Sequence, residues 1–168
     1  EIRENNQPGS PEAVLNKLWS RVSRGSKAAA LGAVFGALAA HVYMLTNKFP
    51  NHDDLSVTFF HSGEATQYVM TGRWFLAPAI RLFGGSSMPW LIGLVSILLL
   101  GVSAVFVCRC LKIEKPLYCA LAGAVMAVFP AVTSTLTYMF TAGAYFAALA
   151  LSCLAAFIAS RGRKLWPV

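Results

Sequence analysis

The sequence predicts an all-α protein, a polytopic membrane helical bundle with about four transmembrane helices and amphipathic interfacial helices in its first outer loop. Of the 168 residues, 57% are hydrophobic and only 12% are charged, and the mean hydropathy is +0.59. A soluble domain usually carries about 25% charged residues. The apolar residues also gather in several runs of about 20, the length that crosses a bilayer as a helix.

Residues 1–27 are expected to form a cytoplasmic segment that contains a short amphipathic helix over residues 11–24. Its apolar residues share one face: Val14, Leu15, Leu18, Trp19 and Val22. Basic residues decorate the other side: Lys17, Arg21, Arg24 and Lys27. A helix of this kind is typical of one that lies on an anionic membrane surface.

The remaining residues, 28–168, predict the transmembrane region, with spans over residues 28–46, 88–107, 117–132 and 139–160. Gly32 and Gly36 in the first span have the spacing that lets another helix approach closely, although a merely Ala-rich span explains them equally well. His41, near the outer end of this span, is expected to be a packed or interfacial residue rather than a ligand. Pro130 lies near the outer end of the third span, and residues 133–138 predict a short outer turn.

Residues 47–87 are expected to form one long outer loop with two short helices along the membrane surface. Short bursts of apolar residues alternate with polar ones, and breaks are expected near Gly63 and Gly72. A connection of this length inside a small bundle is usually functional.

The positions of the basic residues predict the orientation. In a four-span topology only Lys48, Arg73 and Arg81 fall on the side of the long loop, and the other cations near the spans fall on the opposite side. Because Lys and Arg favour the cytoplasmic side, we expect both termini in the cytoplasm and the loop outside.

Several function classes find no support. The net charge of +7 comes from cations beside the apolar runs rather than from a basic stripe, so nucleic acid is not expected. The chain lacks a P-loop, a dinucleotide fingerprint and a Gly-x-Ser-x-Gly motif. Cys108 and Cys110 could form half of a metal site, but no second half follows. We expect all four cysteines to be reduced: Cys108, Cys110, Cys119 and Cys153.

The chemistry-bearing residues lie in the outer loop. Asp53 and Asp54 are adjacent carboxylates, and a carboxylate at a membrane boundary can take a proton from a hydroxyl nucleophile. Alternatively, Asp53 caps the start of a helix. Arg73, between Gly72 and Trp74, suits a lipid phosphate, although snorkelling to the headgroups is the common role of such an Arg.

These motifs together resemble the amino-terminal part of the Gtr-type bacterial O-antigen glucosyltransferases, which belong to the GT-C class. The resemblance covers residues 28–164 and rests on Asn51-His52-Asp53-Asp54, Ser62-Gly63, Gly72-Arg73-Trp74 and Phe129-Pro130. It implies that glucose passes from a polyprenyl-phosphate-linked donor to a hydroxyl of a surface polysaccharide such as O-antigen, at the bacterial inner membrane. The loop would then be periplasmic or extracellular.

The resemblance also implies roles for individual residues. Asp53 or Asp54 would act as general base, and Arg73 would stabilise the phosphate. Further substrate-binding candidates are His61, Glu64, Lys48 and Trp74, of which His61 and Glu64 more often have structural roles. No cofactor is assigned and no metal ligands are named; a divalent metal at the two acids stays open, because two carboxylates and one His make an incomplete shell.

Members of this family have more spans than this chain, so we expect a fragment of a larger enzyme or a subunit that needs a membrane protein partner. Two other functions compete with catalysis. One is a non-catalytic subunit or scaffold, which the Ala- and Gly-rich first and fourth spans would suit. The other is a small transporter or flippase, which is less favoured because ionisable residues are missing from the middle of the spans.

Overall fold

The computed structural model describes residues 11–47, 53, 68–82 and 88–162, and every regular element in these ranges is an α-helix. Three helices are long and apolar enough to cross a membrane: α2 (Arg24–Thr46), α6 (Pro89–Cys110) and α9 (Met139–Arg161). A fourth span is formed if α7 (Pro116–Val128) and α8 (Pro130–Thr137), which are bent by 44°, are taken together. The chain is thus an all-α, multi-pass membrane bundle, as predicted.

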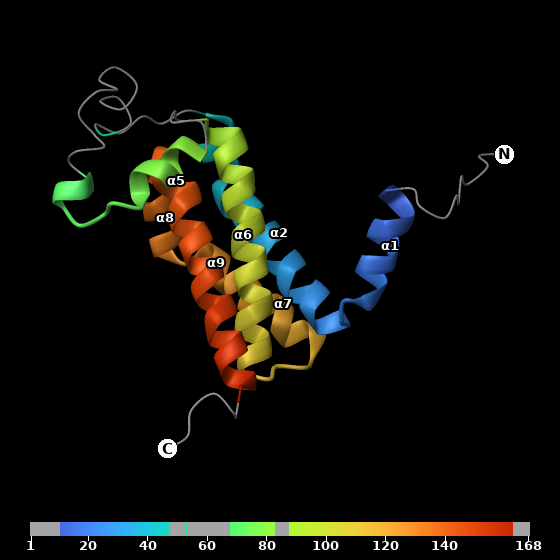
Figure 1. Cartoon of the computed structure of the whole chain (residues 1–168). Coiled ribbons are helices and arrows are strands. Elements are labelled where there is room, and N and C mark those ends of the chain that lie inside the picture. Colours follow the sequence, from blue (N-terminus) through green and yellow to red (C-terminus); the bar gives the residue numbers. More distant parts are fainter. Residues whose placement is uncertain (1–10, 48–52, 54–67, 83–87, 163–168) are drawn as a thin grey trace.

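The helices pack around α6, which contacts α2, α7 and α9 (Figure 1). The closest packing is that between α2 and α7, and α8 and the short helix α5 (Leu76–Leu82) both lie against α9. Helix α1 (Pro11–Arg21) lies apart from the bundle in Figure 1. The arrangement leaves α5 at the end of the bundle opposite to the α6–α7 connection.

Local sequence signals explain where the helices begin. Helix α2 starts at Arg24 rather than at residue 28 because the Ser23 hydroxyl accepts a hydrogen bond from the Ser26 N–H at 3.2 Å, which caps the helix. Helices α6, α7 and α8 each carry proline in their first turn, where a missing N–H costs nothing. Helix α6 also continues past the predicted end at residue 107 to Cys110.

A seam of small residues holds α2 against α7. A Cβ atom built on Gly32 would collide with the carbonyl group of Ala120, and one on Gly123 would collide with the backbone of Ala29. Gly36 faces Ala124 at the next turn, where a Cβ atom would lie 3.1 Å from the Cα atom. The close approach predicted from Gly32 and Gly36 is therefore made within the chain, and these glycines are not available to a partner helix.

The predicted turn over residues 133–138 is wrong, because this segment forms helix α8 up to Thr137. The helix is interrupted earlier, at Phe129, whose ψ of 136° is extended, and Pro130 then starts the new helix. Two of its threonines fit into α8 because their hydroxyls donate to carbonyls of the same helix: Thr135 to Ala131 at 2.8 Å and Thr137 to Ser134 at 2.6 Å.

The buried imidazole of His41 binds a carbonyl that this helix interruption leaves without a partner in its own helix. His41 is 3% exposed, and its Nε2 lies 3.1 Å from the carbonyl oxygen of Ala127, in the last turn of α7. A carbonyl only accepts, so Nε2 must carry the proton and donate. His41 is therefore a packed residue, as predicted, and it satisfies a carbonyl that a continuous helix would have paired.

Replacing His41 by leucine is expected to destabilise the chain by about 1–2 kcal/mol, because the Ala127 carbonyl is left without its donor in an apolar environment. Thermal unfolding of the purified chain in detergent measures this loss. His41→Gln, which keeps a donor of similar reach, is expected to recover part of the stability. Equal stability of the leucine variant and the parent chain would contradict the role assigned to this bond.

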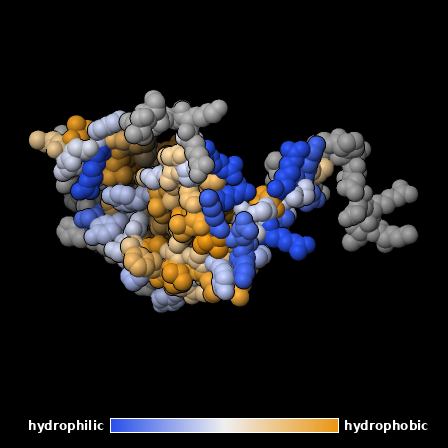
Figure 2. Space-filling view, turned by 90° about the horizontal axis from the view of Figure 1, so that it is seen from below, coloured by the Kyte–Doolittle hydropathy of each residue, from blue (hydrophilic) through white to orange (hydrophobic). Residues whose placement is uncertain are grey.

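Most of the described basic residues lie in α1 or at the end of the bundle that carries the α6–α7 connection. Figure 2, which views the molecule from that side, shows hydrophilic side chains over α1 and at the edge of the bundle next to it, beside a broad hydrophobic area. At this end the Lys27 ammonium group lies 4.9 Å from the centre of the Trp19 ring, and thus joins α1 to α2. The four cysteines are free thiols.

Candidate functional site

The structure describes only part of the predicted site. Asp53 is helical and exposed, whereas Asp54 and the candidates His61, Glu64 and Lys48 lie outside the described residues, as does the expected break at Gly63. An N-cap residue has extended rather than helical dihedrals, so the helical state of Asp53 counts against its interpretation as a cap.

The described part of the loop turns sharply at Gly72, as predicted. Gly72 has φ of 76°, a left-handed conformation that favours glycine. Its N–H donates to the Val69 carbonyl at 3.0 Å, and the Arg73 N–H donates to the Tyr68 carbonyl at 2.7 Å. These two bonds form a Schellman motif, which ends the helical turn over residues 68–70 and fixes the backbone direction at Arg73.

Helix α5 follows this turn and is seated on the first part of α9. Leu76 and Ile80, one turn apart, are buried against Phe140, and Tyr68 and Ala144 pack around them. The loop therefore has an apolar anchor on a membrane-spanning helix, which places Arg73 beside α9.

A groove of about 830 Å³ lies between α5 and α9. Its walls are almost entirely apolar; one side comes from α9, which contributes three alanines, and the other from α5 and the residues just before it. The lining residues are Arg73, Phe75, Leu76, Pro78, Ala79, Leu82, Ala144, Tyr145, Ala147, Ala148 and Leu151.

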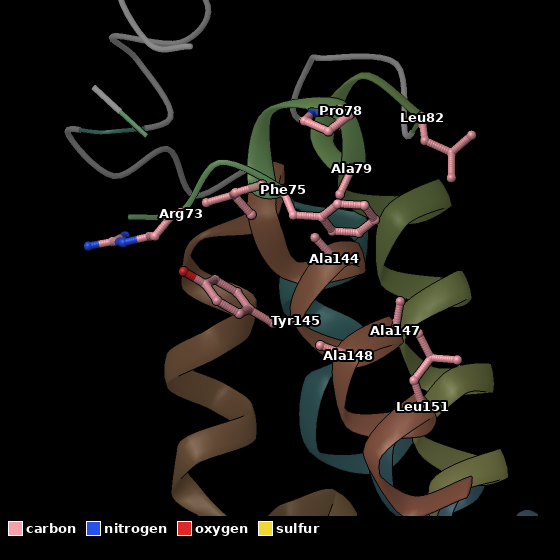
Figure 3. Close-up of a pocket in the computed structure, with 11 residues that line it drawn as sticks. Arg73, Phe75, Pro78, Ala79, Leu82, Ala144, Tyr145, Ala147, Ala148 and Leu151 are labelled. Carbon is pink, nitrogen blue, oxygen red and sulfur yellow. The ribbon is translucent and has the colours of Figure 1, made fainter. Parts of the chain in front are cut away.

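The two polar side chains of the groove share one end of it. Figure 3 shows the Arg73 guanidinium and the Tyr145 hydroxyl directed to the same side, while Leu82 and Leu151 lie on the other side. Arg73 is exposed and has no salt bridge to a carboxylate among the described residues. Trp74 is 68% exposed and lies outside the groove, with its ring edge-to-face to Phe75 at 5.6 Å.

This arrangement suits an amphiphile with an anionic head and an apolar chain. A guanidinium offers several N–H donors to a phosphate and keeps its charge at any physiological pH. The apolar walls stabilise a hydrocarbon by about 0.8 kcal/mol for each methylene removed from water. Sequence reasoning identified Arg73 but missed Tyr145 and the alanines of α9, whose only signal was the i, i+3, i+4 spacing of Ala144, Ala147 and Ala148.

Metal binding finds no support in the described part of the chain, where no three His, Cys, Asp or Glu side chains come together. Asp54, one of the two acids for which a divalent ion was considered, lies outside that part.

Comparison with known proteins adds one finding. A family model described as glucosyl transferase GtrII matches residues 42–167, which include the outer loop, the groove and the helices from α5 to α9. No curated protein and no solved structure matches the chain.

Proposed function

This chain belongs to the glucosyl transferase GtrII family, and from that premise we propose that it transfers glucose from a polyprenyl-phosphate-linked donor to a surface polysaccharide such as O-antigen, alone or as part of a larger enzyme. The observation that supports this donor best is the groove between α5 and α9, with Arg73 at one end. The groove thus combines a charged end with apolar walls, and a polyprenyl phosphate likewise joins one anionic group to a long hydrocarbon.

The proposed step exchanges one bond of the anomeric carbon for another and moves one proton. A hydroxyl of the acceptor glycan attacks the anomeric carbon of the glucose, and the bond from that carbon to the phosphate oxygen breaks. Asp53 or Asp54 accepts the hydroxyl proton, and polyprenyl phosphate leaves. The phosphate changes from a diester with one charge to a monoester with a second, developing charge. A guanidinium at Arg73 stabilises this charge more in the transition state than in the bound donor, which is what accelerates the reaction.

The distribution of cations supports an orientation for this reaction. Among the described residues, Arg73 and Arg81 lie at the loop end, while Lys27, Arg109 and Arg161 lie at the other end of their spans. We propose that this second end faces the cytoplasm and that the groove opens toward the outer side of the bacterial inner membrane, where the acceptor glycan is found.

The test of the donor site is binding of polyprenyl-phosphate-glucose to the purified chain in detergent. Arg73→Gln is expected to weaken binding by about tenfold, because a charge-assisted contact to the phosphate is lost. The matched control is Arg81→Gln, which removes an exposed arginine from the same loop but not from the groove. It should change the affinity by less than about twofold. Equal losses in the two variants would show a diffuse effect of charge and contradict a phosphate site at Arg73.

A further inference from the structure

Two arginines converge on one phenylalanine ring at the end of the bundle away from the groove. The Arg161 guanidinium carbon lies 4.4 Å from the centre of the Phe157 ring, and that of Arg109 lies 5.8 Å from the same centre. Both distances are within the range of a cation–π contact, about 6 Å. Phe106, whose ring centre is 5.5 Å from that of Phe157, supports the ring from α6. Helices α6 and α9 thus each bring one guanidinium group to the same ring.

Helix α2 contributes a third element to this cluster. The Arg109 Nε donates to the Ser26 hydroxyl at 3.2 Å, and that hydroxyl lies 2.9 Å from the hydroxyl of Ser23. This bond uses one N–H of Arg109 and leaves the terminal nitrogens of its guanidinium for another acceptor. Neither Arg109 nor Arg161 has a salt bridge to a carboxylate within the part of the chain that the structure describes.

Two guanidinium groups at one ring repel each other, and an anion that contacts both of them reduces the repulsion. We infer that Arg109 and Arg161 bind the phosphate of an anionic phospholipid. Along α9, the stretch from Ala144 in the groove to Arg161 is about 25 Å long at 1.5 Å per residue, close to the thickness of a bilayer's hydrocarbon core. The cluster therefore lies at the level of the headgroups of the leaflet opposite to the groove.

The surroundings favour a lipid over a soluble phosphate. On α6, Val102, Phe106 and Arg109 follow one another at the spacing of one helix face, and Val102 is 45% exposed. Ile158, next to Phe157 on α9, is 54% exposed. These apolar side chains offer a surface along which an acyl chain extends from the phosphate. The site does not depend on the proposed transferase function; only the assignment of its leaflet to the cytoplasmic side rests on the proposed orientation.

The experiment is native mass spectrometry of the purified chain in detergent, titrated separately with phosphatidylglycerol, phosphatidylcholine and inorganic phosphate. Phosphatidylglycerol is expected to bind at least about tenfold more tightly than phosphatidylcholine, and the double variant Arg109→Gln/Arg161→Gln should remove that preference. The control Lys112→Gln/Lys115→Gln removes two charges from the same end but not from the Phe157 ring. It should leave the preference within about twofold of the parent chain.

The other outcomes are informative. Equal losses in the two double variants would overturn the proposal in favour of a diffuse positive surface. Inorganic phosphate that binds the parent chain as tightly as phosphatidylglycerol does, and loses that binding in the double variant, would overturn the assignment to a lipid. If the double variant does not fold, Arg161→Gln alone, at the last residue of α9, replaces it and should lower the preference by several-fold.

Discussion

Gly123→Ala is expected to destabilise the chain by about 2 kcal/mol or more, although the same change in an ordinary helix interior stabilises by about 1 kcal/mol. The added Cβ atom would lie 2.9 Å from the backbone nitrogen of Ala33 and would collide with the carbonyl oxygen of Ala29. Both atoms belong to the backbone of α2, so they cannot rotate away as a side chain does. Helices α2 and α7 would have to separate along their whole small-residue seam.

The matched control for this prediction is Gly101→Ala in α6. The nearest atoms to its added Cβ would be the Ala30 carbonyl oxygen at 3.5 Å and a Val34 methyl carbon at 3.6 Å, which are ordinary contacts. This variant should be as stable as the parent chain or more stable. Thermal unfolding in detergent, followed by circular dichroism, compares the two. If Gly123→Ala were no less stable than Gly101→Ala, the helices would not be held as closely as the structure has them.

The first helix of this seam could be predicted from the sequence, but its partner could not. Gly32 and Gly36 have a spacing that shows directly in the chain, and the prediction of a close approach follows from the spacing alone. Nothing local says that Ala120 and Gly123, far along the chain, would fill that approach. The choice of partner depends on the whole topology, in which α7 returns beside α2 after α6.

The bend between α7 and α8 shows a different limit. Pro130 is a local signal, and it does mark a break, but the polar run that follows it does not form the predicted turn. Serine and threonine hydroxyls can bond the carbonyl one turn earlier, so a Thr-rich segment is compatible with a helix when those carbonyls are within reach. Pairing of His41 with Ala127 then depends on α2 lying beside the break.

Some residues of the candidate site could likewise be predicted from local sequence, and others could not. Gly72 and Arg73 were predicted from their neighbours in the sequence, because a glycine at a turn and an exposed arginine are local features. Ala144, Ala147 and Ala148 were not, because a stripe of alanines on a span looks the same whether it packs or stays open. Here Ala144 packs against the anchors Leu76 and Ile80 of α5, and the groove continues along α9 to Ala147 and Ala148.

The largest effect on function is expected from the two acids of the outer loop. If one of them is the general base, its replacement by asparagine should lower glucose transfer by about 100-fold to 10,000-fold, because asparagine accepts no proton at neutral pH. The assay measures labelled glucose passing from polyprenyl-phosphate-glucose to the surface glycan, in cells that contain equal amounts of the parent chain, Asp53→Asn or Asp54→Asn. A deficit in one variant alone would identify the base.

Two further measurements separate catalysis from structure. Donor binding to the purified variants should stay within about twofold of the parent chain, since a base that acts on the acceptor contributes little to holding the donor. Asp53→Ser distinguishes the two interpretations of Asp53, because serine caps a helix as well as aspartate does but is no base at neutral pH. Full transfer by both Asp53→Ser and Asp53→Asn, which each keep a side chain that caps a helix, would return Asp53 to a structural role. Full transfer by both asparagine variants would contradict the proposed mechanism, while the family assignment and the donor groove would stand.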